Sequence, residues 1–184
     1  IEEMVAMNCT AVDIAYSPND LYRLKREGKK AIMLGIENGY AIGKDLSRVA
    51  HFRKRGVVYM TLCHNGNNDI CGSARYNEEN LGVTPFGEQV IQEMNRLGMM
   101  VDLSHSGERT FYETLDISSQ PVVCSHSSSR ALCDHPRNLT DEQLRAITRK
   151  GGVVQVCLYS GFLRKERPAH ILDAIEHLNH MVNV

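Results

Sequence analysis

Two short apolar segments that end in the same dipeptide constrain this chain more than any other feature. Residues 99–103 and 121–124 are each followed by a Ser-His pair, and the two histidines are His105 and His126. The segment between them has the length of a crossover helix, which predicts two parallel strands in one sheet. Parallel neighbours end at one edge of the sheet, where α/β folds place their chemistry. We therefore expect the two imidazoles to lie side by side on that edge.

A metal site is one interpretation of this histidine pair, and a structural role is the other. A single histidine at the end of a strand more often forms a structural hydrogen bond or caps a helix than binds a metal. The matched pair makes the two interpretations about equally strong, so further ligands have to decide between them.

The rest of the chain repeats the alternation of strands and helices. Further apolar segments predict strands over residues 31–37, 57–63 and 153–158. Capped or amphipathic segments predict helices over residues 1–10, 20–27, 46–55, 84–97, 141–150 and 168–182. This alternation is typical of a parallel α/β fold whose strands are buried on both faces. We expect one domain over residues 1–184.

The residues that close the five predicted strands are mostly reactive. They are Glu37, His64, His105, His126 and Tyr159. The (β/α)8 barrel is the architecture that gathers such residues around one centre. Five βα units are too few to close a barrel, so the sequence predicts an α/β fold in the form of a partial (β/α)8 TIM barrel with about five parallel βα units.

Charge and composition exclude some partners. The formal net charge is −1, with 21 basic and 22 acidic residues, so no electrostatic basis exists for binding nucleic acid or an anionic membrane. The apolar runs are far shorter than the ~20 residues of a membrane span. The six cysteines form no CxxC or disulfide pattern, which favours a reducing compartment, and we expect a cytoplasmic protein. The acidic start lacks an initiator Met, so a preceding signal or anchor is the alternative.

The strand ends supply a plausible zinc ligand set. Glu and His suit Zn²⁺, and Glu37, His105 and His126 would provide three ligands with a position left for water. A carboxylate can also bridge two ions. Asp102 lies inside a strand, so we interpret it as a supporting residue that contacts a ligand, rather than as a ligand.

Two further residues on the same rim are candidates for substrate binding. His64 lies outside the ligand set, before a polar loop of about eighteen residues that is either functional or disordered. It could donate a hydrogen bond to a developing oxyanion, and a structural role is equally consistent with the sequence. Arg137 could hold a carboxylate through two parallel hydrogen bonds, although a loop arginine taken alone is usually solvated.

Five segments of the chain together resemble the membrane (renal) dipeptidase family of zinc peptidases. They are GIENGYAI, TLCHNGNNDI, GVTPFGEQVIQEMNRLGMMVDLSH, VVCSHSSSRALCDHPRNLTDEQL and GGVVQVCLYSGFL, and they extend from about residue 31 to the C-terminus. The resemblance implies a (β/α)8 barrel of roughly twice this length. It also implies hydrolysis of the peptide bond of dipeptides through activated water at two zinc ions bridged by a glutamate.

The resemblance implies a role for each matching residue. Glu37 would be the catalytic bridging glutamate, and His105 and His126 would ligate one zinc ion. His64 would contact the substrate near the reacting carbonyl and so act in catalysis. Arg137 would hold the C-terminal carboxylate of the dipeptide, with Asn138 and Tyr159 lining the same pocket.

The chain departs from the family pattern at both ends. The family's His-x-Asp pair, which holds the other zinc, does not precede residue 31, and its late-strand Asp is absent. We therefore expect this chain to be the central portion of a dipeptidase, inactive by itself. Two alternatives remain: a non-catalytic homologue that binds metal or peptide, and an amidohydrolase-like hydrolase of lactones or amides. For the assembly of the protein, a homodimer is one possibility that we consider.

Overall fold

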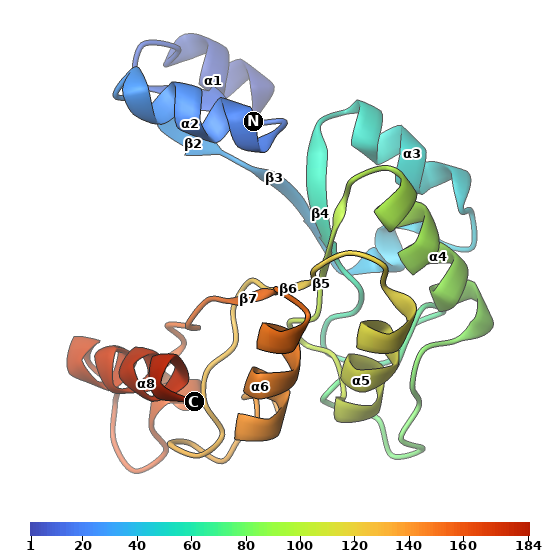
Figure 1. Ribbon diagram of the computed structural model, residues 1–184, viewed down its shortest axis with the longest axis vertical. Helices are drawn as coiled ribbons and strands as arrows, with labels where there is room; N and C mark the ends of the chain where they lie inside the picture. Colours follow the sequence, from blue (N-terminus) through green and yellow to red (C-terminus); the bar gives the residue numbers. More distant parts are fainter.

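The computed structural model describes all residues from 1 to 184 (Figure 1). The strands are β1 (Val12–Ile14), β2 (Lys30–Ile32), β3 (Leu34–Glu37), β4 (Val57–Thr61), β5 (Met100–Asp102), β6 (Val123–Cys124) and β7 (Val153–Val154). The helices are α1 (Glu2–Met7), α2 (Pro18–Arg26), α3 (Ser47–Lys54), α4 (Pro85–Arg96), α5 (Glu108–Ile117), α6 (Asp141–Arg149), α7 (Ser160–Leu163) and α8 (Ile171–Asn183), with a short 3-10 helix, η1, at Gly39–Ile42.

Five strands form one parallel sheet in chain order, β3-β4-β5-β6-β7. Helices α3, α4, α5 and α6 connect successive strands and pack along one side of the sheet (Figure 1). Sequential parallel neighbours joined by helical crossovers are the building units of a (β/α)8 barrel. The structure thus confirms the predicted parallel α/β fold and the partial barrel.

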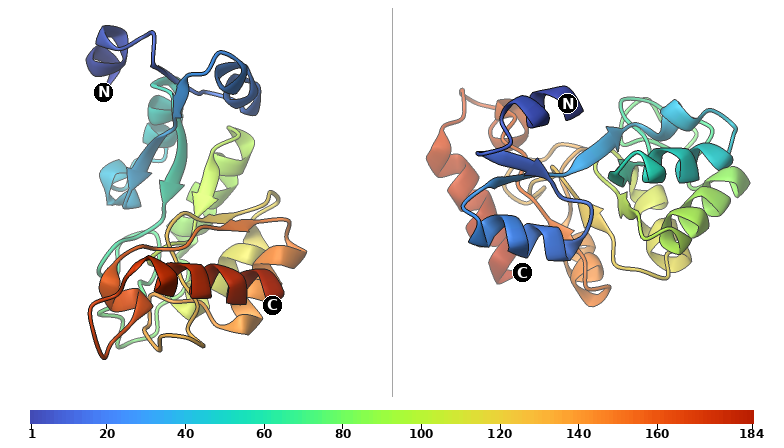
Figure 2. Two further views of the ribbon diagram at one scale, coloured as in Figure 1. Left: turned by 90° about the vertical axis from the view of Figure 1, so that its left-hand side faces the viewer. Right: turned by 90° about the horizontal axis from the view of Figure 1, so that it is seen from above.

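The N-terminal region differs from the prediction. The single strand expected over residues 31–37 is two strands, because β2 pairs with the unpredicted strand β1 while β3 pairs with β4. The register of the β3–β4 pair shifts between Leu34 and Gly35, where a Cβ on Gly35 would lie only 2.1 Å from the Tyr59 ring. Figures 1 and 2 show α1, α2, β1 and β2 at one end of the molecule, with α6 and α8 towards the other.

The strands are shorter than predicted, so most of the candidate site residues lie beyond them. Glu37 is the last residue of β3, whereas His126 lies two residues after β6 and Tyr159 lies five residues after β7. His64 and His105 each follow their strands by three residues. The strands stop early because backbone amides beyond them bond side chains instead of a neighbouring strand. For example, the amide of Ser104 donates to the Asp102 carboxylate at 3.0 Å.

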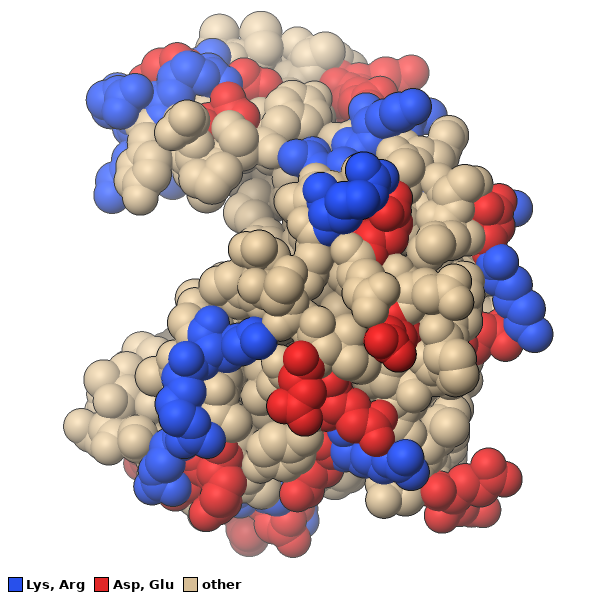
Figure 3. Space-filling model, turned by 45° about the vertical axis from the view of Figure 1, so that its right-hand side comes forward, with Lys and Arg blue, Asp and Glu red and all other residues tan.

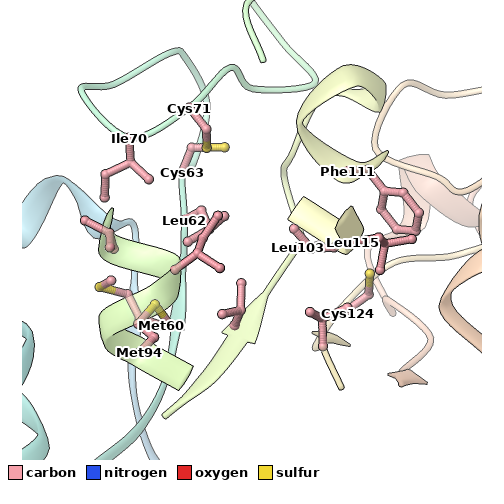
Figure 4. Packing of buried hydrophobic residues seen from close by; sticks show 14 of the residues in the cluster. Met60, Leu62, Cys63, Ile70, Cys71, Met94, Leu103, Phe111, Leu115 and Cys124 are labelled. Carbon is pink, nitrogen blue, oxygen red and sulfur yellow. The ribbon is translucent and has the colours of Figure 1, made fainter. Parts of the chain in front are cut away.

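The hydrophobic core lies between the sheet and its helices. Its buried members include Met60 and Leu62 from β4 and the following residue, Met94 from α4 and Phe111 from α5 (Figure 4). The other face of the sheet is open towards its edges, because β3 and β7 have exposed residues, and this departs from the expectation that the strands are buried on both faces. The middle strands match the expectation, since Met60 and Thr61 of β4 and Val101 and Asp102 of β5 are all buried.

This open face is hollowed. Residues from several strands line a cavity of about 360 Å³ there: Met33, Tyr59, Met100, Val123, Ser125, Val153 and Gln155. Figure 3 shows the molecule deeply indented between its N-terminal end and its main body, with acidic and basic side chains interspersed over the surface.

Helix α8 has its apolar residues on one face, as predicted, but that face is exposed. Ile171, Ile175, Leu178 and Val182 are 44–76% exposed, while Asp173 and His177 are buried. No helix in the structure has the length and apolar character that crossing a membrane requires.

The loop between β4 and α4 has a fixed conformation, although the sequence left open a disordered one. Asn68 accepts hydrogen bonds from the amides of Ile70 and Cys71 and donates to the carbonyl of Leu62 at 2.8 Å. Asn77 bonds both the amide and the carbonyl of Leu81. Asparagine side chains thus replace the missing backbone pairing along this loop.

Candidate active site

The three predicted metal ligands converge at the C-terminal edge of the sheet. The Oε1 atom of Glu37 lies 3.4 Å from Nε2 of His105 and 3.4 Å from Nε2 of His126. The two Nε2 atoms are 2.9 Å apart, and the potential ligand atoms of all three residues lie within 4.8 Å of one another. Strands β3, β5 and β6 therefore deliver one carboxylate and two imidazoles to a single point.

His64 borders this cluster. Its Nε2 lies 3.7 Å from the same Glu37 oxygen, and its ring centroid is 4.1 Å from that of His105. It is not part of the ligand group within 4.8 Å, in keeping with its predicted place outside the ligand set. An imidazole at this distance can reach a molecule that binds beside Glu37.

A buried carboxylate braces the two histidine loops. Oδ1 of Asp102 accepts the backbone amides of Ser104 and Ser125, at 3.0 and 2.9 Å. Its Oδ2 accepts the hydroxyls of Thr61 and Ser125, at 2.7 and 2.5 Å. Asp102 is completely buried, and these four donors pair both of its carboxylate oxygens. This is the supporting role that its position inside a strand suggested.

The same network determines which nitrogen of His126 carries the proton. The single hydroxyl proton of Ser125 is donated to Oδ2 of Asp102 in the 2.5 Å contact between them. The 2.8 Å contact between Ser125 Oγ and Nδ1 of His126 then requires the imidazole to donate from Nδ1. Its Nε2 is left with a free lone pair facing Glu37, which is the form that binds a metal ion.

His105 has an uncommon backbone conformation, and burial favours the neutral form of its ring. Its backbone has φ of 72°, an uncommon conformation for a residue other than glycine. Its carbonyl accepts the amide of Ala74 at 2.8 Å, which ties the long loop to the site. Burial, followed by the positive charge of Arg137, lowers the pKa of His105 to about 2. Burial and Arg137 also lower the pKa of His126.

Arg137 is a buried cation without a carboxylate partner. Its side chain is 3% exposed and forms no salt bridge, and burial lowers its pKa. Nη2 donates to the carbonyl of His126 at 3.2 Å, and the guanidinium lies 5.5 Å from the centre of the Phe162 ring. Its Nε has no hydrogen-bond partner. A buried, unpaired guanidinium next to the cluster is a ready site for an anionic group.

Unpaired polar atoms concentrate around this site. Seven of the eight buried side-chain atoms that lack a hydrogen-bond partner belong to residues 105–138. One is Thr114 Oγ1 in helix α5, and the other six follow β5 or β6: His105 Nδ1, Ser106 Oγ, Ser127 Oγ, Ser129 Oγ, Arg137 Nε and Asn138 Oδ1. Native proteins rarely leave such atoms unpaired away from functional sites.

The structure does not bring Asn138 and Tyr159 to the metal cluster. Both amide protons of Asn138 are used, one on the carbonyl of Cys133 and one on that of Phe162, each at 2.8 Å. Asn138 therefore fixes its own loop against α7. Tyr159 is 64% exposed, and its ring lies 4.8 Å from Phe162, at the outer side of the Arg137 region.

Three residues with clear contacts at the site were not singled out in the sequence. Ser125 and Ser104 support His126 through its Nδ1 and its backbone amide, respectively, and Phe162 lies against Arg137. The repetition of Ser before both histidines was the available signal for the two serines. No sequence pattern pointed to Phe162.

These features place the chain among barrel-type α/β proteins with a candidate metal centre, and comparison with known proteins identifies the family. The sequence profile of the membrane dipeptidase family (Peptidase family M19) matches residues 1–184. An uncharacterized dipeptidase of Schizosaccharomyces pombe is 41% identical over 165 residues, which cover 87% of this chain and 40% of the yeast protein.

Solved structures agree with this result. An amidohydrolase from Pseudomonas aeruginosa is 33% identical with a TM-score of 0.93, covering 100% of this chain and 56% of that one. A metallo peptidase from Rhodobacter sphaeroides, liganded with a phosphinate mimic of the dipeptide L-Ala-D-Ala, is 27% identical with a TM-score of 0.83. That match covers 94% of this chain and 52% of the Rhodobacter chain.

The chain belongs to the membrane dipeptidase family, which confirms the resemblance found in the sequence. It spans about two fifths of the length of the yeast relative and about half the length of the two solved chains.

Proposed function

We propose that the full-length protein is a zinc dipeptidase and that this chain supplies the central part of its active site. The observation that carries the proposal is the convergence of Glu37, His105 and His126 within 4.8 Å. Family membership and the dipeptidase names of the relatives support it. The finer part of the proposal is a pair of zinc ions bridged by Glu37.

The donor set fits zinc. Two neutral imidazoles and one carboxylate are typical ligands of a catalytic zinc ion, and the relay from Asp102 through Ser125 leaves Nε2 of His126 free to coordinate. When bound, the metal would polarise the scissile carbonyl and lower the pKa of a water molecule.

The remaining residues would bind and orient the dipeptide. Arg137 would take the C-terminal carboxylate, because a buried guanidinium that has no counter-ion gains most from a substrate that brings one. His64, 3.7 Å from Glu37, would donate a hydrogen bond to the oxygen of the reacting carbonyl. Tyr159 would form the outer wall of the pocket.

A hydrolysis assay on the full-length protein tests this proposal. L-Ala-D-Ala is the first substrate to try, because a solved relative binds a phosphinate mimic of it. We expect hydrolysis that stops after treatment with a chelator and returns when zinc is added. Zinc binding without hydrolysis of any dipeptide would indicate a non-catalytic homologue. Hydrolysis of lactones or cyclic amides, but not of dipeptides, would indicate the other class of hydrolase.

A further inference from the structure

Helix α8 buries a histidine and exposes its apolar face. His177 is 1% exposed, whereas Ile171 and Val182 on the same helix are 68% and 76% exposed. A polar side chain at a buried position needs partners for its polar atoms, since leaving them unpaired costs stability. The contacts of His177 therefore show why α8 lies with this side inward.

Both ring nitrogens of His177 are paired with the backbone of other segments. Nδ1 accepts the amide of Ser129 at 3.0 Å, and Nε2 lies 3.2 Å from the carbonyl of Leu163. An amide can only donate and a carbonyl can only accept, so the ring is neutral with its proton on Nε2. Burial lowers the pKa of His177, which favours this form.

The two segments held by His177 enclose Arg137. Ser129 lies in the loop that follows His126. The end of this loop packs beside its beginning, because the Arg130 amide donates a hydrogen bond to the carbonyl of Leu139 at 2.7 Å. Arg137 lies in a turn just before Leu139, at this end of the loop. Leu163 is the last residue of α7. The residue before it, Phe162, places its ring beside the Arg137 guanidinium, and its carbonyl accepts a hydrogen bond from the side-chain amide of Asn138.

We propose that His177 is a positioning residue for substrate binding: by joining the Ser129 loop to the end of α7, it holds Arg137 where it can bind the dipeptide carboxylate. This inference rests on the proposed function, because it takes a carboxylate as the partner of Arg137. His177 itself lies in α8 and takes part in no contact with Glu37, His105 or His126.

The charged groups near His177 have other structural tasks. Asp173 on the same helix binds Arg164 and Arg167, at 2.7 and 2.8 Å, and anchors the segment between α7 and α8. His180, one turn further along α8, contacts Asp141 at the start of α6 at 2.8 Å. His180 thus offers a matched control: it is a histidine on α8 that bonds another element but does not touch the Arg137 loop.

Kinetics of the full-length, zinc-loaded protein test the proposal with three variants. His177→Phe fills the site but pairs neither backbone group, so we expect KM for L-Ala-D-Ala to rise about 10- to 100-fold, with a much smaller change in kcat. His177→Gln offers an acceptor and a donor and should recover most of the loss. His180→Phe should leave KM unchanged. For the dipeptide amide, which lacks the carboxylate, His177→Phe should behave as wild type.

A second measurement does not depend on hydrolysis. Amide hydrogen exchange at Ser129 should be faster in His177→Phe than in wild type and unaffected in His180→Phe, because only the first variant removes the acceptor. If the phenylalanine variant does not fold, His177→Asn, which is too short to reach both partners, takes its place in both measurements.

The outcomes separate this inference from the proposed function. A wild-type protein that cleaves no dipeptide contradicts the proposed function, whatever the exchange shows. An active wild type whose KM is the same in His177→Phe and in His180→Phe overturns the positioning role of His177. An equal loss for the free dipeptide and its amide also overturns it, because a general structural defect would then explain the effect.

Discussion

The candidate site has two halves that differ in burial and in hydrogen bonding to the rest of the chain. His105 and His126 are 8% and 30% exposed, and Ser125 connects Nδ1 of His126 to the Asp102 network. The side chains of Glu37 and His64 are 55% and 40% exposed, and the polar contacts of the Glu37 carboxylate are with the three imidazoles alone. The half formed by His105 and His126 is more deeply buried and in contact with supporting residues, whereas the half formed by Glu37 and His64 is partly exposed to solvent.

For Glu37, the difference follows from the position of its strand in the sheet. Strands β5 and β6 have neighbours on both sides, so the side chains at their ends can hydrogen-bond across to the next strand. Strand β3 is an edge of the five-stranded sheet and pairs only with β4. An orientation fixed by packing and hydrogen bonds needs neighbours on each side, which β3 lacks, and this explains the exposure of Glu37. His64 follows β4, which has neighbours on both sides, so the sheet edge does not explain its exposure.

The largest expected effect comes from the less supported half. Glu37→Gln keeps the size of the side chain but removes its charge, and would therefore remove the proposed bridge between two zinc ions. Loss of several kcal/mol of charge stabilisation corresponds to a fall in kcat/KM of about 1,000-fold or more. Zinc content measured by mass spectrometry should fall in parallel. Because Glu37 is exposed, the melting temperature of the metal-free protein should stay unchanged, and a large drop in it would contradict the comparison.

Arg137→Lys tests the anion site next to the histidine half. Lysine keeps the charge but loses the paired donors of the guanidinium. Breaking a buried charge pair typically costs ~2–5 kcal/mol, or about 30- to 4,000-fold in kcat/KM for the free dipeptide. Hydrolysis of the dipeptide amide should change little, and zinc content should stay at the wild-type level. Equal losses on both substrates would show that Arg137 acts only on the structure of its loop.

Asp102→Asn tests whether the hydrogen-bonded half owes its zinc affinity to the network. The amide cannot accept from all four donors, so the orientation of His126 should loosen. Replacing such supporting partners typically costs about 10- to 100-fold in metal affinity. Competition with a chromophoric chelator measures this change. Asp173→Asn is the matched control: it alters another buried carboxylate, whose partners are Arg164 and Arg167, and should lower stability without changing zinc affinity.

Local patterns in the sequence were enough to predict the crossover units. The predicted helix over residues 84–97 is α4, whose first turn is capped by Thr84, and Thr140 closes a capping box at the start of α6. The spacing of Glu37, His105 and His126 predicted their convergence because parallel strands end at one edge. These features depend on neighbours in the sequence or on the direction of strands.

The features that the sequence did not predict depend on contacts between distant segments. Strand β1 is only three residues long and forms because β2 pairs with it. The outward apolar face of α8 follows from the hydrogen bonds of His177 to Ser129 and Leu163, which are 48 and 14 residues away. A helical pattern in a sequence shows which residues share a face but not which face is buried.

Counted per pH unit, the smallest expected effect is on stability in acid. Burial and Arg137 lower the pKa of His105 to about 2, while the unfolded value is near 6.5. The folded state binds fewer protons below about pH 6.5, so the free energy of unfolding falls as the pH decreases, by at most about 1.4 kcal/mol per pH unit for this residue. Urea unfolding of the metal-free protein measures the slope, and His105→Gln should flatten it. An equal slope in the variant would contradict the buried, neutral state of His105.

The position of the bound metal tests the central claim most directly. Anomalous diffraction at the zinc edge, from crystals of the full-length protein that hydrolyses L-Ala-D-Ala, locates the ions independently of any kinetic argument. We expect zinc at about 2.0–2.2 Å from a carboxylate oxygen of Glu37 and from Nε2 of both His105 and His126. An active enzyme whose zinc lies elsewhere, or that leaves either histidine uncoordinated, would contradict it.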